Sequence, residues 1–277
     1  MELLQAIFLG VLQGLTEFLP ISSSAHLAIY PKFFGWEDPG AAFTAVVQIG
    51  TELAVLIYFR HDIWTIGSGW VRGLFSRAAR QEHEWRMGWF VIIGSMPIVL
   101  LGLVLEDAID SQFRNLWVIG STLIVLGLVL ALAERVGRLD RPIEKLSWGH
   151  AIAFGLAQAA ALVPGVSRSG ATITMGLFLG YERAAATRYA FLLAIPAVVG
   201  AGLYKLKDVP GADNPYGIGP TAVATVVSFV VGYASIAWLL KYVSTHSYTP
   251  FVIYRVGLGA LVLVLVGAGV ITAGVAA

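Results

Sequence analysis

The sequence predicts an all-α, polytopic membrane protein with an inverted-topology repeat, built from six transmembrane helices and two re-entrant helix–loop–helix hairpins. Hydrophobic residues make up 57% of the 277-residue chain and charged residues 13%, with a mean hydropathy of +0.78. That is too little charge to cover a soluble globule of this length. Residues 6–27 and 151–172 also align without gaps at an offset of 145. We therefore interpret residues 1–277 as a single membrane domain whose two repeats are residues 1–134 and 149–277.

Each repeat begins with a hairpin, at residues 3–34 and 149–180. In both, an apolar, helix-like run is interrupted by a proline, Pro20 or Pro164, and then by a polar loop rich in serine. Each half is too short to cross the hydrocarbon core, which takes about 20 residues of helix. A broken helix is tolerated at membrane depth only where the freed backbone groups are buried in protein or line a polar cavity, so a repeated pair of breaks predicts a binding site.

Six longer apolar runs predict the membrane spans, three in each repeat. Because a hairpin returns to its own side, each repeat crosses the membrane an odd number of times, and the second repeat is inserted upside down relative to the first. The predicted spans are residues 41–59, 88–106, 115–134, 183–204, 220–241 and 250–274.

The distribution of Lys and Arg among the loops predicts the orientation. One side receives twelve basic residues, several of them in a basic loop at 60–86, and the other side receives four. The richer side is expected to be cytoplasmic, which places both termini and the first hairpin on the outer face of the plasma membrane. The twelve are Arg60, Arg72, Arg77, Arg80, Arg86, Arg135, Arg138, Arg141, Lys145, Arg183, Arg188 and Lys241, and the four are Lys32, Arg114, Lys205 and Lys207.

The first hairpin carries most of the polar groups expected at membrane depth, where an ionisable side chain indicates a functional site. Gln13 and Glu17 are four residues apart and share one helix face. They point toward the loop that contains Ser22–Ser24 and His26. We expect Glu17 and His26 to meet in one pocket. At least one of the three serines is expected to serve only as a helix N-cap.

The second hairpin supplies the complementary groups in the run PGVSRSGAT, residues 164–172. The guanidinium of Arg168 matches the oxygens of a phosphate. The hydroxyls of Ser167 and Ser169, the backbone at Gly170 and the N–H groups of a helix expected to begin near Thr172 would complete an anion site. Ser167 and Ser169 could equally be helix caps.

Together the two hairpins offer an anion-binding arginine, a carboxylate, an imidazole and nucleophilic hydroxyls. This set suits phosphoryl transfer, in which the protein positions the reactants and stabilises charge. The spacing does not decide which serine is the nucleophile. Because the site lies within the bilayer, we expect a phosphate carried on a lipid as the substrate.

These residues resemble a known family. The runs QGLTEFLPISSSAH at 13–26 and PGVSRSGAT at 164–172 are similar to the two signature motifs of the undecaprenyl pyrophosphate phosphatase, or bacitracin-resistance, family. The resemblance implies hydrolysis of a polyprenyl diphosphate to its monophosphate on the outer face, which recycles the lipid carrier of cell-wall glycan synthesis. It also implies a divalent cation, magnesium or calcium. The implied roles fall on Gln13, Glu17 (also a candidate metal ligand), Ser23 as nucleophile, His26 and Arg168.

Two positions depart from what the resemblance implies. Some family members carry Glu where this chain has Gln13, and an amide is a weaker ligand for a hard cation. Glu52 lies in the apolar span 41–59, where an aliphatic residue is expected, and needs a partner or a path to water. Arg255, in the last span, is a candidate partner for Glu52. A structural ion pair and a substrate contact are both open for this arginine.

Two other functions share features with this sequence. Inverted repeats are also typical of secondary transporters and lipid translocators, but the positions equivalent to Glu17 and His26 are Leu162 and Ala171, an asymmetry that favours catalysis. A phosphatidic-acid-type phosphatase would need a histidine six residues after the arginine, and position 174 is Thr174. The expected partners are a polyprenyl diphosphate and membrane lipid, with no nucleic acid; the sequence leaves a homodimer open.

Overall fold

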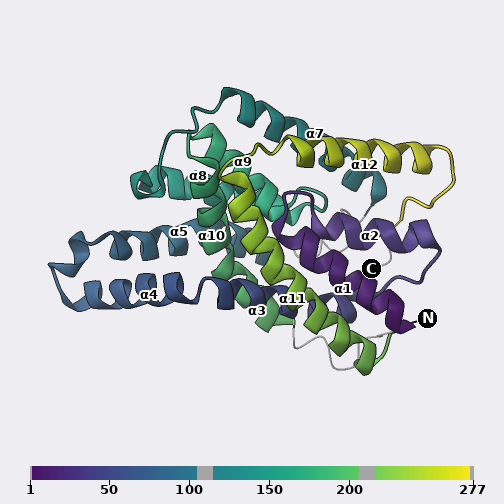
Figure 1. Cartoon of the computed structure of the whole chain (residues 1–277), viewed down its shortest axis with the longest axis horizontal. Helices are drawn as coiled ribbons and strands as arrows, with labels where there is room; N and C mark the ends of the chain where they lie inside the picture. The colour runs from purple at the N-terminus through teal and green to yellow at the C-terminus, as the bar shows by residue number, and fades with distance from the viewer. Residues whose placement is uncertain (1, 105–114, 206–215, 275–277) are drawn as a thin grey trace.

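The computed structural model describes residues 2–104, 115–205 and 216–274, and within these ranges the chain folds into helices, with isolated β-bridges in place of strands. Figure 1 shows the arrangement of the helices. The α-helices are α1 (Glu2–Phe18), α2 (Ser23–Phe34), α3 (Gly40–Tyr58), α4 (Arg60–Phe75), α5 (His83–Val104), α7 (Leu116–Val136), α8 (Trp148–Ala159), α9 (Arg168–Phe178), α10 (Arg183–Lys205), α11 (Ile218–Val243) and α12 (Thr249–Gly267).

The two predicted hairpins are helix–break–helix units. The first break separates α1 from α2, and the second separates α8, with a 3₁₀ turn at Ala160–Leu162, from α9. Both breaks end in a serine with positive φ, Ser22 at 75° and Ser167 at 69°, whose side chain accepts a hydrogen bond from the backbone N–H three residues on. Helix α9 therefore begins at Arg168, and the expected start near Thr172 was wrong because Ser167 already caps the helix.

The half-helices that precede the breaks pack in equivalent ways. Helix α1 packs against α11, and α8 packs against α5. A Cβ on Gly10 would lie 2.5 Å from the backbone oxygen of Ala224, and one on Gly155 would lie 2.4 Å from that of Gly94. Both positions, 145 residues apart, therefore need glycine because two helix backbones approach closely there.

The protein is a multi-pass membrane protein by the length and hydropathy of its helices. Four helices among the described residues, α5, α7, α11 and α12, are long and apolar enough to cross a bilayer, and α3 and α4 form a fifth candidate as a pair bent by 68°. The predicted spans agree with helix bounds to within a few residues, except that α12 ends at Gly267 rather than at 274. Helix α10, at the predicted span 183–204, is not among the candidate membrane spans of the described residues. Residues 105–106 of one span, and Arg114 and Lys207 of the charge count, lie outside the described residues.

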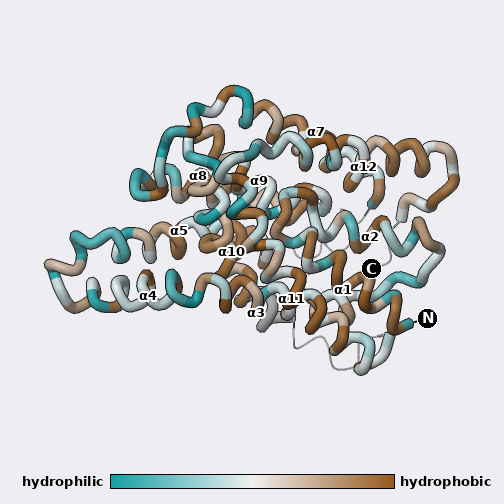
Figure 2. Tube along the Cα trace, viewed as in Figure 1, coloured by the Kyte–Doolittle hydropathy of each residue, from teal (hydrophilic) through white to brown (hydrophobic). Residues whose placement is uncertain are grey.

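The basic segment 60–86 is helical, and the expectation of a loop there was wrong. Helix α4 runs beside the first half of α5, and the pair projects from the rest of the molecule, with a hydrophilic tip (Figures 1 and 2). Gly69 and Gly73 leave room for Glu84 and Trp85 of α5. This close approach packs apolar side chains between the two helices and stabilises helix in a sequence with many charges.

Candidate active site

The two breaks meet in the interior of the molecule. The hydroxyl of Ser169, at the start of α9, donates a hydrogen bond to the carbonyl of Leu19, just after α1, at 3.1 Å. The last turn of α1 and the first turn of α9 therefore lie side by side, although their residues are 150 positions apart in the chain.

Glu17 is the centre of the polar contacts between the two hairpins. Its Oε2 accepts hydrogen bonds from the Ser23 hydroxyl at 2.6 Å and from the Gln13 amide at 3.2 Å. Its Oε1 accepts a hydrogen bond from the guanidinium of Arg168 at 2.5 Å. The side chains of Glu17 and Arg168 remain 11% and 21% exposed, so the ion pair is accessible from a pocket. One carboxylate thus links a hydroxyl from the first hairpin to an arginine from the second.

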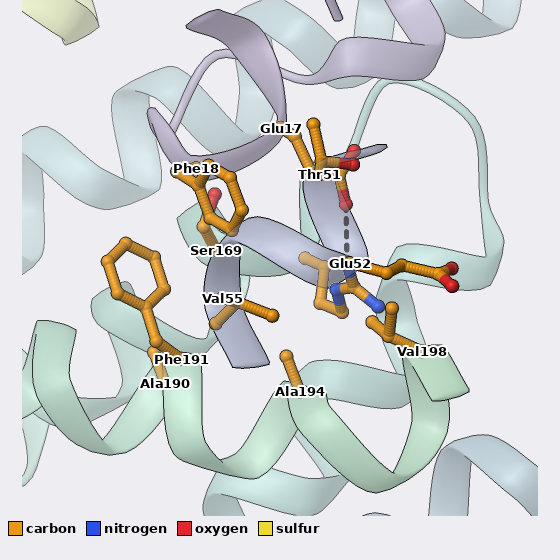
Figure 3. A pocket seen from close by; sticks show the side chains of 11 residues that line it. Glu17, Phe18, Thr51, Glu52, Val55, Ser169, Ala190, Phe191, Ala194 and Val198 are labelled. Atoms are coloured by element: carbon orange, nitrogen blue, oxygen red, sulfur yellow. Dashed lines mark hydrogen bonds and ion pairs between the residues drawn. The ribbon is translucent and has the colours of Figure 1, made fainter. Parts of the chain in front are cut away.

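The pocket beside this ion pair has a polar wall and an apolar wall. Its empty volume is about 360 Å³, its open mouth to solvent included. Figure 3 shows Glu17, Thr51 and Glu52 on one side and Phe18 and Phe191 on the other. The apolar residues that line it are Phe18, Val55, Ala190, Phe191, Ala194 and Val198. A charged headgroup and an apolar chain could therefore be contacted in one place.

The serines of the two breaks form matched pairs. Ser22 and Ser24 lie 3.2 Å apart at their hydroxyls, and so do Ser167 and Ser169. In each pair the first serine also caps the following helix, as Ser22 does for Ala25 N–H. Ser22 and Ser167 are buried. Ser23 is the serine of the first hairpin whose hydroxyl is bonded to a carboxylate.

Gly170 and Thr172 face the protein interior. The Thr172 hydroxyl is buried and donates to carbonyls of its own helix, those of Arg168 and Ser169. A Cβ on Gly170 would lie 2.6 Å from a guanidinium nitrogen of Arg255. We expected a bound anion to approach the backbone at Gly170, but in the structure the Arg255 side chain makes this close approach.

His26 does not reach the Glu17 carboxylate, contrary to the expectation that the two would share a pocket. Its Nδ1 lies 2.6 Å from the carbonyl of Ser22 and its Nε2 lies 2.7 Å from the hydroxyl of Tyr254. The ring is fully buried, stacks on Tyr30 and Tyr254, and is not among the residues that line the pocket. Because a carbonyl accepts only, Nδ1 carries the proton and Nε2 accepts from the tyrosine. The sequence pattern did not indicate that Tyr254 is the partner of this histidine.

Arg255 does not pair with Glu52, and that expected pairing was wrong. Its guanidinium donates to the carbonyls of Pro20, Gly165 and Val166. Carbonyls left free by the two breaks accept from both terminal nitrogens of the arginine, whose Nε is buried without a hydrogen-bond partner. Glu52 instead lines the pocket beside Glu17 and Arg168.

Comparison with known proteins finds matches over nearly the whole chain. Residues 6–261 match the family described as bacitracin resistance protein BacA. The chain belongs to this family. It is 67% identical to a protein of Nocardioides sp. named undecaprenyl-diphosphatase, over 98% of this chain and 99% of the relative. Relatives with the same name from Micrococcus luteus and Thermobifida fusca are 57% and 55% identical, over 99% and 98% of this chain and 100% and 93% of their own lengths.

The family match covers nearly the whole chain, so both breaks and most residues of the helices that hold them fall within it. Both motif runs, 13–26 and 164–172, lie inside residues 6–261, as does the Tyr254–Arg255 pair of α12. The site described above is therefore part of the family's own region and not an addition to it.

Proposed function

We propose that the protein is a membrane phosphatase that hydrolyses a polyprenyl diphosphate, of the undecaprenyl type, to the monophosphate and inorganic phosphate. The observation that carries this proposal is the position of Glu17, whose carboxylate is bonded to the Ser23 hydroxyl and to the Arg168 guanidinium at once. A nucleophile next to a base, with an anion binder beside both, is the arrangement that phosphoryl transfer needs. The names of the relatives support the same substrate.

In the first step, the Ser23 oxygen attacks the terminal phosphorus and its proton passes to Glu17. The bond between that phosphorus and the bridging oxygen breaks, and the polyprenyl monophosphate leaves with the electron pair. Glu17 then passes this proton to the leaving monophosphate. In the second step, water attacks the phosphoserine and gives a proton to Glu17, the bond between phosphorus and the Ser23 oxygen breaks, and the Ser23 oxygen takes that proton back as inorganic phosphate is released. Arg168 stabilises the charge that develops on the phosphoryl oxygens in both steps.

Arg168 and Glu17 exchange partners when a substrate binds. In the free protein the guanidinium is neutralised by Glu17. A diphosphate in the pocket competes for the same planar donors, because arginine binds phosphate oxygens in the geometry in which it binds a carboxylate. The carboxylate that is released from Arg168 stays bonded to the Ser23 hydroxyl, whose proton it accepts.

The residues of the pocket fit the divalent cation that the family resemblance implies. Magnesium and calcium prefer oxygen ligands, and magnesium often uses one or two carboxylates together with substrate phosphates. Glu17 and Glu52 line the same pocket, and the Oε1 of Gln13, beside Glu17 and Thr51, is buried without a hydrogen-bond partner. Among the described residues, no three acidic, His or Cys side chains lie together in a group that could hold a metal ion by itself. The cation, when bound, would neutralise charge on the diphosphate, with Glu17 and Glu52 as its protein ligands.

The packing supports the six-helix inverted repeat as the framework of this site. Helix α1 on α11 and α8 on α5 are equivalent contacts between halves, as are the contacts of α3 with α11 and of α10 with α5. With the basic side in the cytoplasm, the first hairpin and the site would open outward. The same symmetry favours lipid translocation as a second function, which vesicle-reconstituted protein would show as movement of an unhydrolysed lipid phosphate.

The decisive experiment measures phosphate release by the detergent-purified protein from a long-chain polyprenyl diphosphate. The wild type is expected to release one phosphate per lipid, and Arg168→Ala to release almost none. Arg188→Ala, which removes an arginine paired with Asp62 away from the pocket, is the matched control and should stay active. Absence of release by the wild type, with or without magnesium, would contradict the proposal.

A further inference from the structure

Arg255 is a buried cation that the reaction described above does not use. It lies in α12, its residue is 1% exposed, and it makes no ion pair with any carboxylate of the described residues. A buried charge without a counter-ion is costly unless hydrogen bonds satisfy it. The hydrogen bonds it makes therefore indicate why it is there.

The partners of Arg255 are carbonyls from both breaks. Nη1 donates to Pro20 at 3.1 Å, and Nη2 donates to Gly165 at 3.1 Å and to Val166 at 3.0 Å. Pro20 and Gly165 are equivalent positions at the 145-residue offset of the two repeats. Broken helices leave carbonyls without an intrahelical donor. One guanidinium thus satisfies the free carbonyls of both hairpins and holds them on one rigid, planar group.

The atoms held by Arg255 are close in sequence to the reacting groups. Pro20 lies three residues after Glu17 and three before Ser23, and Val166 lies two before Arg168. The carbonyls therefore fix the segment that orients the nucleophile and the segment that orients the anion binder. Because Nη1 holds one segment and Nη2 holds the other, the rigid guanidinium helps to set the distance between the two segments.

Gly170 shows how closely the Arg255 guanidinium packs against α9. It lies in the first turn of this helix, and a Cβ on Gly170 would lie 2.6 Å from Nη1 of Arg255. A glycine in a helix lowers stability relative to alanine. Its presence here is explained by the need to admit the guanidinium between the two breaks.

We propose that Arg255 is a positioning residue for phosphoryl transfer, which sets the register between the Glu17–Ser23 segment and the Arg168 segment without touching the substrate. The kinetic part of this inference rests on the proposed phosphatase activity. The structural part, that one side chain couples both breaks, does not. The two can be tested separately on the same variants.

The first test measures hydrogen–deuterium exchange of the purified protein over residues 19–23 and 163–168. Arg255→Met, similar in length but without donors, should speed exchange in both segments together. Arg183→Met, which removes the ion pair with Glu134, is the control and should leave both segments unchanged. Faster exchange in one segment alone, or in neither, would overturn the coupling.

The second test separates kcat from KM with a polyprenyl diphosphate as the substrate. A misplacement of about 1 Å can cost about 10²-fold in rate; we expect Arg255→Met to lower kcat by about that factor with little change in KM, because Arg168 still binds the phosphate. Arg255→Lys keeps the charge and should recover part of kcat. A wild-type kcat in Arg255→Met, or a loss confined to KM, would overturn the positioning role.

A milder variant covers the case in which Arg255→Met does not fold. Gly170→Ala keeps Arg255 in the sequence, but the added methyl group pushes its Nη1 away from its present position. We expect a smaller fall in kcat and faster exchange in both segments. Unchanged kcat and exchange in a folded Gly170→Ala protein would show that the close contact has no part in holding the two breaks.

Discussion

Arg168 reaches Glu17 across 151 positions of sequence and donates a hydrogen bond to the carboxylate oxygen that Ser23 does not use. The two oxygens of one carboxylate thus serve two different groups. Because the hydroxyl and the guanidinium bond to the same carboxylate, a phosphate that draws Arg168 away from Glu17 also changes the contacts of the side chain that faces Ser23. In the proposed mechanism, substrate binding and activation of the nucleophile would therefore be coupled through this side chain.

Replacing Arg168 with lysine tests whether the planar fork is needed in addition to the charge. Lysine keeps the positive charge but cannot bind a phosphate through two parallel hydrogen bonds. We expect Arg168→Lys to lower kcat/KM by about 10²-fold, the order seen when one oxyanion donor is lost, and Arg168→Ala to lower it further. Phosphate release measures both. Equal activity of the lysine variant and the wild type would mean that only charge matters.

The serines of the first hairpin should differ sharply from one another. Ser23 donates to Glu17, whereas Ser24 contacts Ser22, the N-cap of α2. Ser23→Ala should remove nearly all phosphate release, and the matched Ser24→Ala should keep most of it. Rapid quenching with a substrate labelled in the terminal phosphate should trap label on the wild type and none on Ser23→Ala. Label retained by Ser23→Ala would assign the nucleophile to another residue.

The sequence could predict the breaks because their causes are local. Pro20 and Pro164 disfavour a continuous helix, and of the serines that follow, Ser22 and Ser167 cap the next helix. The face shared by Gln13 and Glu17 follows from helical spacing, and the two side chains do bond. The neighbourhood of His26 could not be predicted in this way, because its ring is held by Tyr254, 228 positions away on α12. The spacing of residues along the sequence does not indicate partners that are this far apart in the chain.

The helical segment α4 shows a different limit of the sequence. Its basic residues indicated a loop, but the segment is helical, and Gly69 and Gly73 are the positions where α5 approaches closely. Glycine lowers helix propensity on its own, and tertiary packing against Trp85 reverses that preference. A glycine can therefore indicate a loop or a close contact between helices. Which of the two applies depends on a packing partner that cannot be identified from the local sequence.

Glu52 should contribute to cation binding. Glu52→Gln keeps the shape of the side chain and removes the charge, and hard cations bind carboxylates more strongly than amides. We expect weaker Mn²⁺ binding, measured by electron paramagnetic resonance of the purified protein with a non-hydrolysable diphosphate present, and a higher magnesium requirement for phosphate release. The exposed Glu82→Gln, in the connection between α4 and α5 and paired with Arg72, is the control. Unchanged Mn²⁺ binding in Glu52→Gln would remove Glu52 from the site.

Gly155 should be essential for packing, since it lies where α8 crosses α5. A Cβ at this position would lie 2.4 Å from the backbone oxygen of Gly94, and a backbone atom cannot move aside as a flexible side chain can. Overpacking of this kind costs about 1–3 kcal/mol, so Gly155→Ala should lower the thermal unfolding midpoint in detergent. Gly149→Ala, in the same helix with nothing within 4 Å of its Cβ, should leave the midpoint unchanged or raise it, because alanine is the better helix former. Equal midpoints for the two variants would show that α8 and α5 are less closely packed than the structure has them.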